Sequence, residues 1–325
     1  MKTVIYLVMV VVLAGCSNSN DDSSDNTTPE TGDFRQEMRD FVIGISQTAK
    51  AVSPNFAIIP QNGIELVSSN GEPDGSPAID YLNAIDGNGQ EDLFYGYDND
   101  DQATSAENTS YLRSYLNISK NAGNTILATD YCSTPSKMTD SYAKNVAAGY
   151  ISYAAPDRNL TVIPTGQPHN VNSDNITSLS QAKNFIFFIN PVNYSTKAEF
   201  IATVNATNYD IIIIDLFLEE QQFTQAEIAQ MKHKANGGSR LIVCYMSIGE
   251  AEDYRYYWDT SWNSTRPSWI AAENPDWPGN YKVKYWNEDW QGIIYKNDDS
   301  YLSKITSAGF DGVYLDIIDA FEYFE

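Results

Sequence analysis

Short runs of apolar, β-branched and aromatic residues recur along the chain, separated by stretches with helical spacing of apolar residues. Runs that stay apolar over four or five positions are typical of parallel strands covered on both faces. The segment 149–162 fits either a further strand or an ordered loop. Eight runs predict strands, at Phe56–Ile59, Asp92–Tyr95, Thr125–Thr129, Phe185–Ile189, Ile211–Ile214, Leu241–Tyr245, Val283–Trp286 and Gly312–Leu315.

The stretches between these runs predict helices, among them Phe34–Lys50, Ser110–Ala122, Thr224–Ala235 and Asp299–Ala308. Thr224 with Glu227 three residues later has the pattern of a capping box. Strands that alternate with helices indicate an α/β fold, and eight strands match a (β/α)₈ TIM barrel better than an open sheet. The chain contains no GxGxxG or Walker sequence, so a nucleotide-binding fold lacks its usual marker.

The first residues predict the cell compartment. Lys2 precedes an apolar run from Val4 to Leu13, which is too short for a spanning helix and typical of a signal peptide. Leu-Ala-Gly followed by Cys16 resembles the lipobox of bacterial lipoproteins, which predicts a signal peptide over 1–16 that ends at a lipidated Cys16. The alternative is an ordinary signal peptide with a chance cysteine.

The domain organisation follows from the composition after Cys16. Residues 17–33 are polar and acidic and cannot bury enough apolar surface to fold, which predicts a disordered tether. The domain that follows, 34–325, would then be lipid-anchored to a bacterial outer membrane, facing the periplasm or exposed on the surface.

The charge balance narrows the partners. Among 325 residues, 20 are Lys or Arg and 43 are Asp or Glu, for a net charge of −23. That charge repels a phosphate backbone and suits a cationic or neutral ligand, so nucleic acid is excluded as a partner. The only histidines are His169 and His233, and Cys132 and Cys244 resemble buried strand thiols, so we expect neither a zinc site nor a histidine-based triad, and no metal or cofactor.

Polar side chains gather directly after the predicted strands, where TIM barrels place their active sites. Several carboxylates at one mouth can perform acid–base work on a glycosidic bond, although any one of them alone is as well explained by a loop or a helix cap. The candidates are Asn62, Asp130, Asp215, Glu250, Asp253, Asp316 and Asp319, together with Glu91, which opens the second predicted strand.

Aromatic residues crowd the window 254–290, which holds eleven Tyr and Trp side chains. Such rings stack on the apolar faces of sugars, and this predicts a carbohydrate cleft in which Tyr254 and Trp286 take part. Many of the rings are equally explained by core packing. Arg255 would contact the ligand or pair with a nearby carboxylate.

Three long strings carry a family resemblance: YMSIGEAEDYRYYW at 245–258, NPDWPGNYKVKYW at 274–286 and GFDGVYLDIIDAFEY at 309–323. They are similar to the endo-α-1,4-polygalactosaminidase-like proteins, glycoside hydrolase family 114 and its bacterial relatives. The resemblance implies a secreted TIM-barrel enzyme that cleaves carbohydrate with carboxylates and without a cofactor.

The order of these motifs is rotated relative to the family. In the usual arrangement the Asp-Ala-Phe-Glu-Tyr segment lies mid-chain and an Ile-Pro-Gln-Asn-Gly strand follows it, whereas here Ile59–Gly63 comes first. The resemblance therefore implies a circularly permuted barrel, which a closed barrel tolerates because chain ends often lie close together. We then expect Phe34 and Glu325 to be neighbours. The alternative is an unrelated N-terminal domain followed by half a barrel.

The resemblance also assigns roles. Asp316 matches the carboxylate expected to act as nucleophile or base, and Glu91 matches the general acid. Asn62, Asp215, Glu250 and Asp319 would line the sugar site. The implied substrate is an α-linked, galactosamine-type polysaccharide, which would be cationic where deacetylated. A non-catalytic carbohydrate-binding lipoprotein and a structural surface protein are the alternatives.

Overall fold

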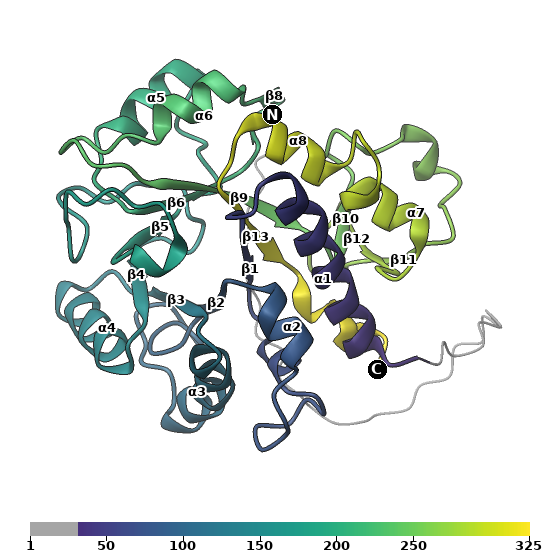
Figure 1. Ribbon diagram of the computed structural model, residues 1–325, viewed down its shortest axis with the longest axis horizontal. Coiled ribbons are helices and arrows are strands. Elements are labelled where there is room, and N and C mark those ends of the chain that lie inside the picture. The colour runs from purple at the N-terminus through teal and green to yellow at the C-terminus, as the bar shows by residue number, and fades with distance from the viewer. Residues whose placement is uncertain (1–31) are drawn as a thin grey trace.

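The computed structural model describes residues 32–325 (Figure 1). Cys16, the predicted signal peptide and residues 17–31 of the predicted tether lie outside the described residues. Within 32–325, no helix has the length and apolar character needed to cross a bilayer.

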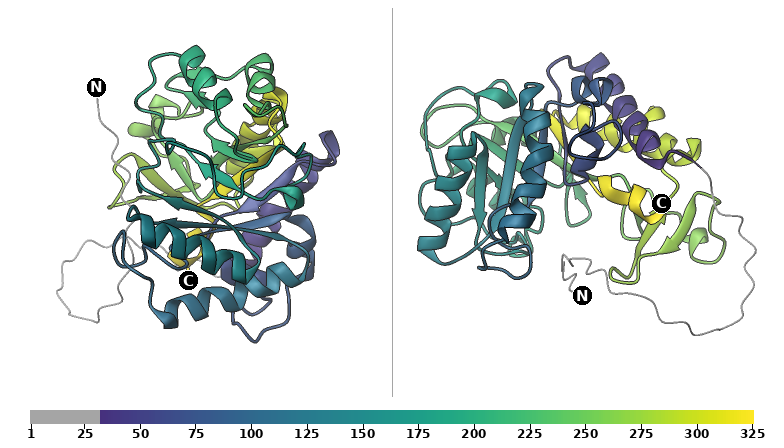
Figure 2. Two further views of the ribbon diagram at one scale, coloured as in Figure 1. Left: turned by 90° about the vertical axis from the view of Figure 1, so that its left-hand side faces the viewer. Right: turned by 90° about the horizontal axis from the view of Figure 1, so that it is seen from below.

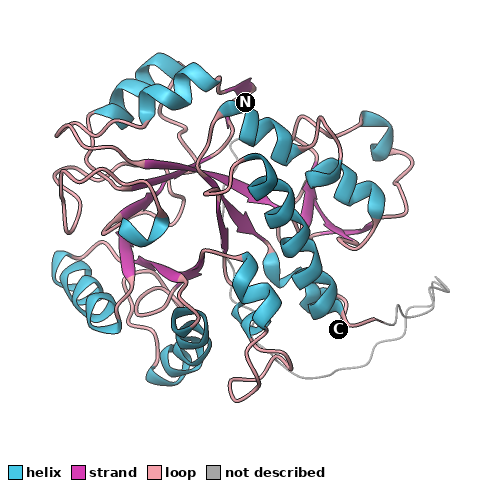
Figure 3. Ribbon diagram, viewed as in Figure 1, coloured by secondary structure: helices cyan, strands magenta, loops and turns pink. Residues whose placement is uncertain are grey.

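Helices surround a set of parallel strands (Figures 1 and 3). The parallel strands are β1 (Ala57–Pro60), β2 (Gly87–Glu91), β3 (Thr125–Tyr131), β4 (Ile151–Ala155), β5 (Phe185–Phe187), β6 (Ile211–Ile214), β9 (Leu241–Ser247) and β13 (Gly312–Asp316). The α-helices are α1 (Phe34–Val52), α2 (Ile79–Ala84), α3 (Ala106–Asn121), α4 (Pro135–Ala148), α5 (Lys197–Asn205), α6 (Gln225–Met231), α7 (Glu288–Gln291) and α8 (Tyr301–Ala308). Shorter helical turns are η1 (Ile64–Val67), η2 (Leu179–Gln181), η3 (Thr260–Asn263), the π-helical η4 (Gly292–Lys296) and η5 (Ile318–Tyr323).

The helices form where local sequence favours them. Asp33 caps α1 by accepting a hydrogen bond from the backbone of Gln36, and apolar side chains at helical spacing, such as Met38, Phe41 and Ile45, are fully buried. The capping box at Thr224 and Glu227 is present in the structure, where it begins α6.

The strands form two parallel sheets that lie next to each other. One has the order β1-β13-β9-β6-β5 and the other β2-β3-β4. A parallel bridge between Gln61 and Gly89 joins β1 to β2, and β4 lies beside β5. The fold is therefore α/β with a parallel central sheet, consistent with a TIM-barrel-like architecture.

The register decides which side chains face the interior of the strand set. Paired residues of parallel strands share a face, so Tyr314 of β13 and Tyr245 of β9 point the same way. Both rings contact that of Phe187 on β5, at 5.0 and 6.2 Å between centroids. Every second side chain on these strands therefore points into a common core. The side chains at the carboxyl ends of the strands lie at the edge of that core.

Two strand predictions need correction, and the segment left open between strand and loop is assigned. The second strand is Gly87–Glu91, not Asp92–Tyr95, which follows it. The unassigned segment contains β4. The run Val283–Trp286 is not a strand of the parallel set, because only Val283 belongs to a strand there, β12.

A small antiparallel sheet follows β9. It consists of β10 (Glu250–Glu252), β12 (Asn280–Val283) and β11 (Ile270–Glu273), in that order, and lies beside the C-terminus in the right-hand view of Figure 2. A two-stranded ribbon, β7 (Phe217–Leu218) and β8 (Gln221–Gln222), follows β6. Both additions follow the carboxyl ends of parallel strands, so they build the edge on which the candidate residues lie.

The two ends of the folded domain are in contact, as the sequence predicts. The ring of Phe34 lies 5.6 Å from that of Phe324 and 5.1 Å from that of Trp286, between centroids. Beside them, Arg35 binds both carboxylate oxygens of Glu325, at 2.8 and 3.0 Å. Trp286 therefore packs at the junction of the ends, and its predicted role in binding sugar stays a prediction.

This junction is expected to contribute to stability. Phe324→Ala removes a half-buried ring that touches Phe34 and Trp286, and should lower the free energy of unfolding by about 2 kcal/mol, below the range for fully buried rings. Tyr323→Ala, at a half-exposed ring, is the control and should cost about 0.5 kcal/mol. Urea denaturation measures both, and equal losses would contradict this account.

Candidate active site

Glu91 and Asp316 end the two strands that flank β1. Glu91 is the last residue of β2, and Asp316 is the last residue of β13. β1 pairs with β13 along its length and is bridged to β2, so both carboxylates lie at the same edge of the strand set. They also interact electrostatically, because the charge of Glu91 is among the causes that raise the pKa of Asp316.

Glu91 is held at both of its carboxylate oxygens. The hydroxyl of Tyr131, at the end of β3, donates to Oε1, and the amide Nδ2 of Asn62 donates to Oε2 at 3.3 Å. The side-chain oxygen of Asn62 in turn accepts from the backbone N–H of Glu91 at 3.2 Å. Asn62 is thus a contact of the carboxylate, as the sequence analysis expected of a residue at this site.

Asp316 has a similar partner on the neighbouring strand. The hydroxyl of Tyr245 donates to its Oδ2 at 2.5 Å. Burial raises the pKa of Asp316 to about 7, although the Tyr245 hydrogen bond opposes the shift, and the charge of Glu91 raises it further. Burial also raises the pKa values of Tyr131 and Tyr245 well above the usual range, so both hydroxyls stay protonated and act as donors.

Left-handed backbone marks the same edge. Asn62, Asp92 and Ile317 have φ of 56°, 60° and 58°, and each of them follows the end of one of the three strands. For non-glycine residues this conformation costs roughly 1–2 kcal/mol, and a β-branched residue such as Ile317 adopts it rarely. Strain of this kind is concentrated at functional sites.

A tyrosine forms the floor beneath the two carboxylates. Tyr314 lies two residues before Asp316, and its hydroxyl is fully buried without a hydrogen-bond partner among the described residues. A Cβ atom on Gly89 would lie 2.0 Å from this hydroxyl oxygen, so only glycine leaves room for it. Burial, and next the charges of Glu91 and Asp316, raise the pKa of Tyr314, which places this hydroxyl close to both.

Asp215 and Arg255 form a second charged group at this edge. Asp215 directly follows β6 and pairs with Nη1 of Arg255 at 2.5 Å. Arg255 also binds Glu252 and the hydroxyl of Tyr301, so it contacts protein groups on several sides. The half-exposed ring of Tyr254 lies 5.6 Å from the guanidinium carbon.

Glu250 and Asp319 meet at the small sheet. Glu250 is fully buried and pairs with Lys282 of β12 at 2.7 Å, while Asn274 and Asn280 donate to its carboxylate at 2.8 and 3.2 Å. Burial raises the pKa of the half-buried Asp319 to about 6, partly offset by the charge of Lys282. These predicted residues therefore neighbour each other.

Asp253 lies at the end of β10. Its backbone N–H donates to the carbonyl of Gly279 at 2.8 Å, and its carboxylate lies so near Gly279 that a Cβ there would be 2.8 Å from Oδ1. Asp253 therefore lies on the small sheet, next to the turn before β12.

Asp130 faces away from the carboxylate pair. Its side chain is fully buried, and its oxygens accept from the backbone of Phe94 and Tyr95 and from the side chains of Ser141 and Asn145, at 2.6–3.2 Å. It joins the loop after β2 to α4, which is a positioning role within the fold.

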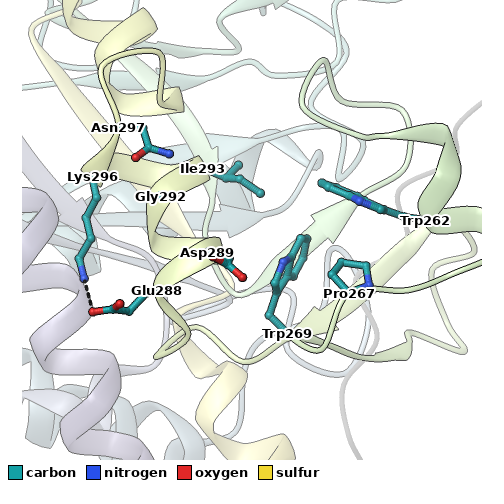
Figure 4. Close-up of a pocket in the computed structure, with 9 residues that line it drawn as sticks. All are labelled: Trp262, Pro267, Trp269, Glu288, Asp289, Gly292, Ile293, Lys296 and Asn297. Carbon is teal, nitrogen blue, oxygen red and sulfur yellow. Dashed lines mark ion pairs between the residues drawn. The ribbon is translucent and has the colours of Figure 1, made fainter.

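The aromatic window forms a packed ring cluster. Trp262 contacts Trp258 and Trp269 at 5.2 and 5.1 Å, and Trp269 contacts Trp290 at 5.0 Å between centroids. Beside this cluster, a cavity of about 530 Å³ opens between the η3 region and α7–η4 (Figure 4). None of the residues lining it belongs to the carboxylate pair. They are Trp262, Pro267, Trp269, Glu288, Asp289, Gly292, Ile293, Lys296 and Asn297.

Four side chains at the site escaped the sequence analysis: Tyr131, Tyr245, Tyr314 and Arg158, which pairs with Asp92. The alternation of strand side chains is the signal that identifies Tyr131, because Tyr131 shares a face with Thr129, and Thr129 is paired in register with Glu91.

Cys132 and Cys244 are buried free thiols. Across residues 32–325, no three His, Cys, Asp or Glu side chains are grouped to hold a metal ion.

The raised pKa of Asp316 predicts a pH-dependent stability. The unfolded chain releases this proton near pH 4 and the folded chain only near pH 7, so the stabilisation is complete below about pH 4 and is lost as pH rises to about 7. Asp316→Asn removes this titration. Relative to the parent, the variant should gain about 1–2 kcal/mol in the free energy of unfolding between pH 4 and pH 8, after discounting for solvent screening.

Urea denaturation at the two pH values measures this difference. Asp289→Asn, at an exposed carboxylate, is the control and should shift stability equally at both. A pH-independent effect of Asp316→Asn would contradict the raised pKa.

Comparison with known proteins finds a family match for just under half of the chain. Residues 166–325 match the model of glycoside-hydrolase family GH114, a segment that contains Asp316 but not Glu91. An uncharacterized protein of Methanocaldococcus jannaschii is 39% identical over 155 residues, and uncharacterized proteins of Thermotoga maritima and Deinococcus radiodurans are 39% and 37% identical over 120 and 119 residues. The alignments cover 47%, 37% and 37% of this chain and 42%, 36% and 36% of the relatives, so the chain spans less than half the length of each relative. The match over residues 166–325 supports a relation of this segment to glycoside-hydrolase family GH114.

Proposed function

We propose that the protein is a glycoside hydrolase in which Glu91 and Asp316 cleave an α-linked amino-sugar polysaccharide. The family of residues 166–325 supports a glycosidase in general. The observation that carries the residue assignment is the pair of carboxylates at one edge, each bound by a buried tyrosine and coupled through the pKa of Asp316.

The two carboxyl groups divide the work of hydrolysis. Protonated Glu91 donates its proton to the glycosidic oxygen as the bond from that oxygen to the anomeric carbon breaks. In one route, ionised Asp316 bonds to the anomeric carbon, and water later hydrolyses this glycosyl-enzyme bond. In the other route, Asp316 takes a proton from a water molecule as that water attacks the anomeric carbon. Retention requires carboxyl groups about 5 Å apart and inversion about 6.5–9.5 Å, so product stereochemistry distinguishes the two routes.

The pKa of Asp316 bears on its proposed role as the ionised group. Burial raises this pKa to about 7, with a smaller contribution from the charge of Glu91, so Asp316 is ionised above about pH 7. In that state it can act as the nucleophile or base that hydrolysis requires.

Electrostatics supports a cationic or neutral polymer as substrate. The net charge of −23 attracts ammonium groups, and several carboxylates lie at the edge that holds the pair. Partly deacetylated galactosamine chains carry such groups and match the substrate class that the sequence resemblance implies.

We further propose that the strands close into a circularly permuted barrel. The Gln61–Gly89 bridge and the neighbouring β4 and β5 support closure, and the contact of Phe34 with Phe324 supports permutation. A permuted chain aligns with its relatives in only one collinear block, as a match limited to 166–325 would suggest. Mapping the strand order onto a solved family member tests this proposal.

For location, we propose a lipid anchor at Cys16 that holds the domain at the outer membrane. The support is the charged start, the short apolar run and the Leu-Ala-Gly-Cys sequence at 13–16. Incorporation of labelled fatty acid that disappears in Cys16→Ala tests it.

Cleavage should depend on both carboxyl groups. Using the chain from Ser17 onward with α-1,4-linked galactosamine polymers of graded acetylation, we expect release of reducing ends. Glu91→Gln and Asp316→Asn should each lower kcat by about 10²–10⁴-fold, the usual contribution of a catalytic acid or base. Asp289→Asn, at an exposed carboxylate outside the pair, should retain full activity.

Other outcomes have definite meanings. Loss in Asp316→Asn alone would assign the acid to another carboxylate, of which Glu250 is the next candidate. Binding of polymer without cleavage by the parent chain would show a carbohydrate-binding protein, and neither binding nor cleavage of any glycan on an array would favour a structural role.

A further inference from the structure

Arg158 connects the loop after β4 to the loop after β2 and to β3, close to Glu91. It lies in the loop after β4 and reaches across to the loop after β2. Its Nη1 and Nη2 bind the two carboxylate oxygens of Asp92 at 3.2 and 2.8 Å, Nη2 also donates to the carbonyl of Gly96 at 2.8 Å, and Nε donates to Asp100 at 2.5 Å. The side chains of Arg158 and Asp92 are only 12% and 10% exposed, so the contact between them is shielded from water, whereas Asp100 is half exposed.

The flat face of the same guanidinium lies on Tyr131. Its central carbon is 3.9 Å from the centroid of the Tyr131 ring, and the hydroxyl of that ring donates to Glu91. Arg158 therefore contacts the ring that binds the Glu91 carboxylate and, through its edge, the residue next to Glu91 in the chain. Tyr131 holds the Glu91 carboxylate, and Asp92 is its neighbour in the chain. Both of these residues contact the same guanidinium, that of Arg158.

We propose that Arg158 is a positioning residue of the active site, which orients the Glu91 carboxylate by stacking on Tyr131 and clamping Asp92. The inference rests on the proposed hydrolase function. It adds a residue to the reaction that lies outside the segment matching the family model.

Charge balance explains why a cation is needed here. Burial raises the pKa of Asp92 to about 7, against the hydrogen bonds from Arg158, and the charge of Glu91 raises it further. Glu91 and Asp92 are thus adjacent carboxyl groups in a shielded place, and Arg158 compensates one of them. Asp92, which directly follows Glu91, is thereby clamped in its left-handed conformation.

The geometry favours arginine over lysine. A planar guanidinium binds two carboxylate oxygens along one edge while its face stacks on a ring, and a lysine ammonium cannot do both. The loop that carries Arg158 is itself fixed, because the carboxylate of Asp157 accepts from the backbone of Asn159 and Thr161 at 3.0 and 3.1 Å.

The test compares Arg158→Lys, Arg158→Met and Tyr131→Phe with Arg240→Met. Arg240 is an even more deeply buried arginine that donates to Thr207 and to the carbonyl of His233, ahead of β9 and at the opposite end of the strands. It therefore controls for the loss of a buried guanidinium without affecting Glu91. Crystal structures, Tm, kcat and KM are measured for each variant.

We expect both Arg158 variants to shift the Glu91 carboxylate away from Tyr131 while the Asp316–Tyr245 contact is kept. Their kcat should fall about 10²-fold with KM changed less than about threefold, because orientation and not binding is lost. Tyr131→Phe should lower kcat similarly, and the Arg158→Lys, Tyr131→Phe double variant should be no worse than either single one. Arg240→Met should lower Tm and leave kcat unchanged.

An unmoved Glu91 in the Arg158 variants, or a loss of kcat that only parallels Tm as in Arg240→Met, would overturn the proposal. If Arg158→Met does not fold, Arg158→Lys and Tyr131→Phe still decide it. If the parent chain cleaves no polymer, the proposed function fails, and the crystallographic position of Glu91 alone decides whether Arg158 positions it.

Discussion

The burial of carboxyl groups close to one another at one edge constrains the arrangement around them. Burial is the main cause of the raised pKa of Asp316, and the charge of Glu91 adds to it, so ionising both groups is unfavourable. Each group has a neutral tyrosine donor on an adjoining strand, which binds the carboxylate without adding a charge. The arginines nearby pair with other carboxylates: Arg158 with Asp92, and Arg255 with Asp215. Within residues 32–325, neither arginine forms an ion pair with Glu91 or Asp316, so the electrostatic interaction between these two carboxyl groups is retained.

Much of the fold could be predicted from the sequence, because buried parallel strands are apolar on both faces. The run Ile211–Ile214 and the core of β9 are examples. β2 could not be recognised in this way, since its sequence is Gly-Asn-Gly-Gln-Glu. Its glycines have a packing reason, as Gly89 makes room for the hydroxyl of Tyr314, but that reason exists only once β13 lies across the core.

The site was predictable where position along a strand decided it. Asp316 ends the recognisable strand β13, whereas Glu91 was identified through its motif, because β2 was not recognised. Asp130 does not join them, because it is one residue out of phase with Thr129 and Tyr131. Tyr131 and Tyr245 are ordinary core residues in the sequence, and their function depends on which strand lies beside them. Arg158 acts through contacts with residues about sixty positions earlier, which no local pattern reports.

The pairing of β1 with β13 has a consequence for how the protein folds. Tyr131 and Glu91 are 40 residues apart and Tyr245 and Asp316 are 71 apart, so each tyrosine–carboxylate contact can form within its own part of the chain. Bringing Ala57 beside Gly312 closes a far longer loop, and such non-local contacts slow folding through their entropic cost. Because β1 lies between the strands that end in Glu91 and Asp316, the proposed catalytic pair is assembled only when this distant pairing is made.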